Sequence, residues 1–167
     1  DTHGSLGGGN ISMTSTGGNV NAIVSGLPVT VGSSRGTANT GILNSSSDQG
    51  NGGTVTLAAA GNVAVGSILS GSTNGAGGSV DLASTNGSVT AISTGTLTSS
   101  AQVSETLSVG GIVTGTTGSG QGGTITITAP GNIRTGWLIT GSPGGSTVSS
   151  SPSIPSSVNG GGNVKLN

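Results

Sequence analysis

The stretch that decides the fold is residues 51–71, which read NGGTVTLAAAGNVAVGSILSG. A pair of glycines opens it, threonine alternates with aliphatic residues, and a glycine turn leads into a second short apolar run. Residues 76–95 (AGGSVDLASTNGSVTAISTG) and 121–141 (QGGTITITAPGNIRTGWLITG) repeat this order. Alternation with a period of two is typical of a strand with one buried face. The recurrence indicates a repeat architecture and not low-complexity filler.

Five glycine pairs open units of this kind, and each pair is followed by two aliphatic residues spaced two apart. Successive pairs begin 44, 25, 45 and 39 residues apart. Stacked units bury one another's apolar faces, so we predict an all-β parallel β-helix, or β-solenoid, with these aliphatic residues in continuous core columns. The predicted column residues are Ile11, Met13, Val55, Leu57, Val80, Leu82, Ile125, Ile127, Val164 and Leu166.

The spacing of 25 residues predicts the length of one coil. Residues 1–167 then form a single solenoid segment of about six to eight coils. This count assigns degenerate coils to residues 27–44 and 96–113, which lack the opening glycine pair. Residues 141–160 are predicted to form a loop, because their prolines remove backbone donors from any ladder. Residues 160–167 (GGGNVKLN) begin an incomplete coil.

The predicted corners between strands are rich in glycine and asparagine. Both residue types are typical of positions with a positive φ angle, which we therefore expect at the corners. Asparagine recurs at one corner position, where stacked side chains would form a hydrogen-bonded ladder. The alternative is a set of turn residues without a ladder. The candidate ladder residues are Asn19, Asn62 and Asn132.

Charge is scarce, with three basic and four acidic side chains among 167 residues, 36 of which are glycine. Disorder is the competing interpretation, but it usually combines low hydrophobicity with a high net charge, and here the formal net charge is -1. Arg35, Arg134 and Lys165 are too few and too scattered for a nucleic-acid partner. We expect no membrane span, because no run of 18 apolar residues occurs.

The acidic residues Asp1, Asp48, Asp81 and Glu105 fall in different predicted elements. Polysaccharide-cleaving β-helix enzymes need clustered carboxylates with a base, or a carboxylate–metal centre. His3 has no Ser or Asp at a useful spacing, and we expect it to be solvated. We therefore predict that the chain is not an enzyme and has no catalytic, cofactor or metal site; cysteine, which could supply thiolate ligands, is absent.

Trp137 is the single aromatic residue and a candidate ligand contact. It would either pack over the core or present a flat face to a sugar ring. Ice binding is a less favoured possibility. It would need a flat outward array of Thr or Ser, whereas the outward positions of the first strands also include Asp81, Asn163 and Lys165.

Residues 50–82 (GNGGTVTLAAAGNVAVGSILSGSTNGAGGSVDL) resemble the haemagglutinin-type repeats of large two-partner-secreted exoproteins, and cyanobacterial surface proteins of that group are especially similar. The resemblance covers residues 7–142 and the last eight residues. It implies a right-handed parallel β-helix that is exported to the cell surface and serves as a shaft or adhesin. It brings no catalytic residues.

The sequence therefore predicts a structural segment of an extracellular or cell-surface fibre, filament or adhesin. Residues 8–13 (GGNISM) and 161–166 (GGNVKL) share one pattern, and the open ends of a solenoid offer unpaired strand edges. The expected partners are copies of the chain stacked end to end, or further repeats of a longer parent chain. The alternative is a module that binds surface glycans through Trp137.

Overall fold

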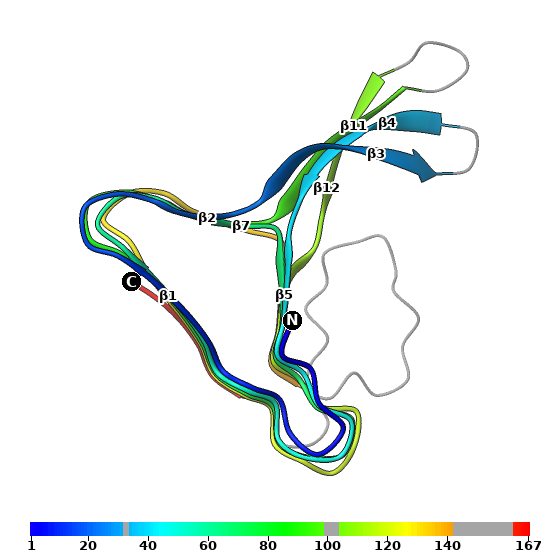
Figure 1. The fold of residues 1–167 in the computed structure, drawn as a ribbon, viewed down its shortest axis with the longest axis vertical. Helices are drawn as coiled ribbons and strands as arrows, with labels where there is room; N and C mark the ends of the chain where they lie inside the picture. The colour runs from blue at the N-terminus through cyan, green and yellow to red at the C-terminus, as the bar shows by residue number, and fades with distance from the viewer. Residues whose placement is uncertain (32–33, 99–103, 142–161) are drawn as a thin grey trace.

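The computed structural model describes residues 1–31, 34–98, 104–141 and 162–167. All of the regular secondary structure in these ranges is β-strand. The chain passes through three short strands in each coil, and equivalent strands of successive coils pair side by side. Figure 1 looks along the stack, so the coils lie one behind another and outline a triangle. The predicted all-β architecture of stacked parallel strands is confirmed.

Three parallel sheets form the sides of the triangle. The first sheet contains β1 (Ile11–Ser15), β6 (Val55–Ala59), β9 (Val80–Ser84), β14 (Ile125–Thr128) and β17 (Val164–Leu166). The second sheet contains β2 (Val20–Ala22), β7 (Val63–Val65), β10 (Val89–Ala91) and β15 (Ile133–Thr135). The third sheet contains β5 (Ile42–Asn44), β8 (Ser67–Leu69), β13 (Gly111–Val113) and β16 (Trp137–Ile139). Coils 1 to 4 begin at β1, β6, β9 and β14.

The first sheet sets the register of the core. Val55 lies opposite Ile11 on one side and Val80 on the other, and the pairing continues to Ile125 and Val164. The column two residues further on runs from Met13 through Leu57, Leu82 and Ile127 to Leu166. These columns are fully buried in coils 2 to 4. They are half-buried in β1 and exposed in β17, because each end strand has a neighbouring coil on one side only.

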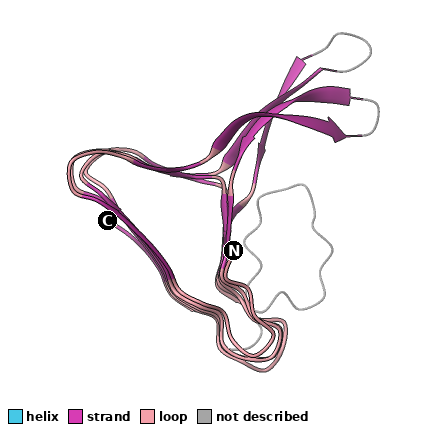
Figure 2. Cartoon of the chain, in the orientation of Figure 1, coloured by secondary structure: helices cyan, strands magenta, loops and turns pink. Residues whose placement is uncertain are grey.

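The two stretches predicted to be degenerate coils are antiparallel hairpins. The first hairpin is β3 (Val24–Val31) with β4 (Ser34–Thr40), and the second is β11 (Ser93–Thr98) with β12 (Ser104–Val109). They leave coils 1 and 3 between the second and third sheets and project from that corner of the triangle (Figures 1 and 2). The prediction failed because alternating apolar residues look alike in a coil strand and in a hairpin strand. The described residues thus hold four coils and β17 of the next.

The two hairpins join into one antiparallel sheet of order β12-β11-β4-β3, which we call the hairpin sheet. Strands β4 and β11 pair directly, although they come from coils that are not neighbours. A hairpin contributes two strands, which together are about 9.6 Å wide, and this equals the spacing of two coils. Coil 2 has no hairpin, since Gly66 alone separates β7 from β8. Hairpins on alternate coils therefore fit side by side without a gap.

The glycines at the corners allow neighbouring backbone segments to approach closely. They do not supply the positive φ angles that we expected. Among the described glycines, Gly110 and Gly111 have positive φ angles, and the paired glycines at the start of each coil do not. A Cβ atom at Gly53 would collide with the carbonyl oxygen of Gly9 and with the hydroxyl of Ser45. The glycine column lets three backbone segments meet where the third sheet turns into the first.

The loop predicted for residues 141–160 lies almost wholly outside the described residues. Strand β17, from the last predicted unit, pairs in parallel with β14.

Candidate functional site

A ladder of polar side chains runs along the corner between the first and second sheets. The side-chain oxygen of Asn19 accepts a hydrogen bond from the backbone N–H of Asn62 (2.7 Å), and that of Asn62 accepts one from Ser88 (2.8 Å). The hydroxyl of Ser88 then accepts the N–H of Asn132 (3.0 Å). These bonds join side chain to backbone and not amide to amide. Ser88, which holds the same position in coil 3, was not among the predicted ladder residues.

A second polar column lies just after the third sheet, and the sequence analysis did not identify it. Its members are Ser45, Ser70, Thr114 and Thr140, and the first three are completely buried. The hydroxyl of Ser45 donates to the carbonyl of Gly9 (2.8 Å), that of Ser70 donates to Gly53, and that of Thr140 donates to Gly162 (3.0 Å). The hydroxyl of Thr114 has no hydrogen-bond partner. In coils 1 and 2 the hydrogen bond from the hydroxyl joins the end of the coil to its own first glycine pair.

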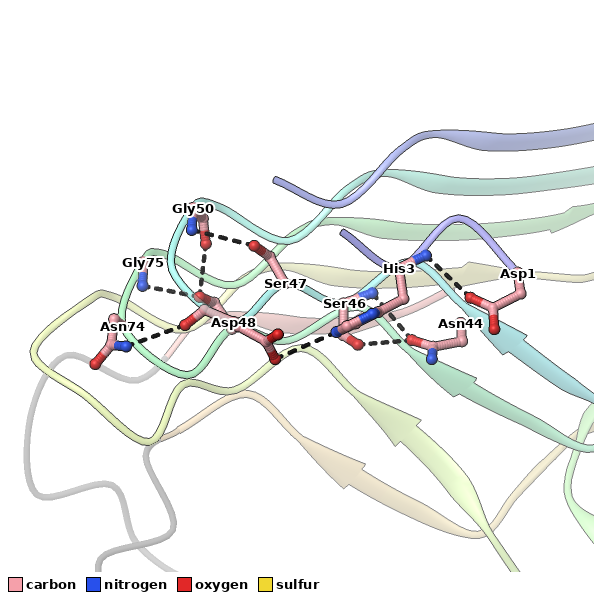
Figure 3. Close-up of polar contacts among 10 residues, drawn as sticks. Asp1, His3, Asn44, Ser46, Ser47, Asp48, Gly50, Asn74 and Gly75 are labelled. Carbon is pink, nitrogen blue, oxygen red and sulfur yellow. Dashed lines mark hydrogen bonds and ion pairs between the residues drawn. The ribbon is translucent and has the colours of Figure 1, made fainter. Parts of the chain in front are cut away.

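The fold brings His3 to Asp48, contrary to the expectation that His3 lacks an acidic neighbour. The Nε2 atom of His3 lies 3.3 Å from Oδ1 of Asp48, and the backbone N–H of His3 donates to the carboxylate of Asp1 (3.0 Å) (Figure 3). The side chains of His3 and Asp48 are 39% and 58% exposed. Such an exposed pair contributes at most about 1 kcal/mol to folding.

The Asp48 turn is part of the scaffold. Its backbone carbonyl accepts a hydrogen bond from the side-chain amide of Asn74, one coil further along (3.1 Å, Figure 3). Asp81 and Arg134 are exposed on other strands. Within the described ranges, no group of three or more His, Cys, Asp or Glu side chains is placed to hold a metal ion. In the same ranges, no helix is long and apolar enough to span a membrane.

The third sheet carries apolar side chains on both faces. Leu43, Ile68, Ile112 and Leu138 belong to the core or pack against it. Their strand neighbours point the other way, because side chains alternate along a strand. We call this outward set the Trp137 face; its members are Ile42, Leu69, Val113, Trp137 and Ile139.

Within the Trp137 face, Ile42 is 61% exposed and Trp137 is 47% exposed. Trp137 sits opposite Gly111 in the neighbouring coil, and Gly111 has no side chain to cover it. Trp137 is thus about half exposed on the outer side of the third sheet, and its role as a ligand contact stays a prediction. Clustered exposed apolar side chains, in contrast to scattered ones, mark interaction sites.

The outward positions of the first sheet hold a mixed column. Ser12, Thr56, Asp81, Thr126 and Lys165 succeed one another in register. This surface is not a uniform array of threonine.

No protein-family model, no curated protein and no solved structure matches the chain.

Proposed function

We propose that the chain is a structural segment of an extracellular fibre, stalk or adhesin, with the right-handed coil that the sequence resemblance implies. The observation that carries the proposal is the unbroken pair of core columns in the first sheet, from Ile11 and Met13 to Val164 and Leu166. Each coil adds about 4.8 Å of length and repeats the same contacts, so such a segment works as a spacer. The Asn19 ladder and the buried hydroxyl column add polar ties along the same axis.

We further propose that solenoid ends join end to end, either between copies or between segments of one longer chain. At one end β1 presents Ile11 and Met13, both half-buried, and at the other end β17 presents Val164 and Leu166, which are 43% and 53% exposed. The two strands have matching patterns, and pairing them would extend the core columns. Such a head-to-tail contact does not close on itself, so it generates filaments.

Electron microscopy and light scattering of the purified protein test the filament. The variant Met13→Asp places a charge in the end column, and we expect it to abolish filaments because an unpaired buried carboxylate is costly. The matched control is Ser12→Asp on the outward side of the same strand, which should assemble like wild type. Wild-type protein that stays monomeric at high concentration would contradict end-to-end assembly. Antibody labelling of intact cells tests the surface location separately.

The second candidate function is a module that binds carbohydrate or another surface through the Trp137 face. The exposure of Trp137 beside other outward apolar residues favours it, because aromatic rings stack on the apolar faces of sugars. A glycan array with wild type, Trp137→Ala and the control Arg134→Ala tests it. Loss of signal in Trp137→Ala alone supports the module. Equal signals in all three proteins would contradict it. Thermal hysteresis in the same preparation would instead support ice binding.

A further inference from the structure

The hairpin sheet has two unlike edges. Strand β3 forms one edge, and its pairing with β4 shifts in register between Val24 and Leu27. The same strand contains Pro28, which has no backbone N–H to donate. Register irregularities and prolines are two of the devices that natural sheets use to prevent strand addition at an exposed edge. We therefore call the β3 edge blunted, meaning that its backbone is unsuited to pairing with a further strand.

The opposite edge, β12, has neither device. It pairs with β11 residue by residue over its whole length, from Ser104 opposite Thr98 to Val109 opposite Ser93, without a shift. Its sequence, SETLSV, contains no proline or glycine. In the described part of the chain, no strand covers its other side. The sheet also projects from the corner of the solenoid (Figure 1), so this edge leads away from the coils.

We propose that the β12 edge is an interaction surface and that its occupant is β12 of a second copy of this chain. A second copy offers two hairpin-sheet edges, and its β3 edge is blunted, which leaves β12. Two identical strands that pair in antiparallel orientation lie about a twofold axis, and such a contact is closed. It joins two four-stranded hairpin sheets into one continuous sheet.

The geometry of the pair separates the two solenoids. Strand β12 runs from the outer end of the hairpin at Ser104 toward the solenoid at Val109. Antiparallel pairing therefore places the two solenoids at opposite ends of the joined strands. The contact is short, so we expect a dissociation constant on the order of 10–100 μM, in the range of weak transient interfaces. This lateral pairing does not depend on the end-to-end contact proposed above.

Engineered cysteines test the pairing directly, because the chain has no cysteine of its own. A twofold antiparallel pair places a central residue opposite its own copy, within the Cα distance that a disulfide spans. We therefore expect Thr106→Cys or Leu107→Cys to form a disulfide-linked dimer under mild oxidation, at twice the chain mass of 15.4 kDa on a non-reducing denaturing gel. The control is Thr30→Cys on β3, which should stay monomeric. If neither β12 variant cross-links, or if Thr30→Cys cross-links equally, the proposal is overturned.

Hydrogen exchange on the unmodified protein gives an independent readout. Raising the concentration through the expected dissociation constant should slow exchange of the β12 amides and leave the β3 amides unchanged. Because the N–H groups of successive strand residues alternate between β11 and the free edge, only one of Thr106→Pro and Leu107→Pro removes an edge donor, and that variant should weaken dimerisation in sedimentation equilibrium by about tenfold or more. Thr30→Pro should have no effect. Equal exchange of β12 at all concentrations would overturn the proposal. End-to-end assembly would protect β1 and β17 instead, so the two contacts are distinguishable.

Discussion

The side-chain oxygen of Asn19 accepts a hydrogen bond from the backbone N–H of Asn62, 43 residues further along the chain, at 2.7 Å. Asn62 repeats the arrangement toward Ser88, and Ser88 toward Asn132. A corner cannot continue the regular strand ladder, so its N–H groups need other acceptors. In each of coils 1 to 3, one side-chain oxygen supplies the acceptor for the coil that follows.

Replacement of Asn62 tests this ladder. Asn62→Ala removes the acceptor of the Ser88 N–H, and we expect a loss of about 1 kcal/mol in the free energy of unfolding. Asn62→Ser should lose less, because serine performs this role at position 88. Urea denaturation of the three proteins measures the difference. Equal stability of wild type and Asn62→Ala would show that the ladder bond adds nothing.

The buried hydroxyl column offers a pair of substitutions with opposite signs. Thr114 is completely buried and its hydroxyl is unpaired, so Thr114→Val removes an unsatisfied polar group without changing the shape of the side chain. We expect it to stabilise the protein by about 1–3 kcal/mol. Ser70→Ala breaks the bond to the Gly53 carbonyl and should destabilise by about 1–2 kcal/mol. Thermal unfolding checks both, and destabilisation by Thr114→Val would contradict the assignment.

Because backbone segments approach closely at Gly53 and not at Gly17, alanine at these two positions should affect stability very differently. Gly53→Ala would drive a methyl group into the carbonyl of Gly9, and we expect a loss of more than about 2 kcal/mol or failure to fold. At Gly17 no other atom lies within 4 Å of the position of a new Cβ atom. Gly17→Ala should therefore be neutral or slightly stabilising, by about 0.4–1 kcal/mol. Melting temperatures of the two variants decide the matter. Similar effects would rule out steric approach as the reason for the Gly53 column.

The free energy of unfolding lost on truncating a core side chain should depend on the position of its coil in the stack. Leu82 is completely buried between coils 2 and 4, and Leu82→Ala should cost about 2–5 kcal/mol. Met13 is half-buried in the first coil, so Met13→Ala should cost clearly less. Denaturant unfolding at a protein concentration below that of any assembly measures both variants. An equal cost would mean that the end coil is packed as tightly as the centre.

The core columns were predictable from the sequence for a physical reason. Each glycine pair fixes the start of a strand, and a period of two then assigns every following side chain to one face. Val55, Val80 and Ile125 therefore fall into register from their distance to the glycine pair alone.

The hairpins and the polar columns were not predictable in the same way. The alternation in residues 27–31 and 105–109 fits any strand, and only tertiary pairing separates a hairpin from a coil. Pro28 was a usable signal, because proline is confined to edge strands and a coil strand inside the stack has two neighbours. The buried Ser45 and Ser70 look like ordinary turn residues in the sequence, since nothing there reveals that they are enclosed.

If the chain works as the shaft proposed above, the hairpin sheet has a mechanical consequence. Strands β4 and β11 tie coil 1 to coil 3 outside the stack, so coil 2 is held between two coils that are themselves fastened together. A pulling force that begins to unwind coil 1 must also shear this tie before coil 2 can come loose. Under tension the first three coils would then unfold together as one unit. The number of coils that such a tie spans would set how much chain is released in each unfolding event.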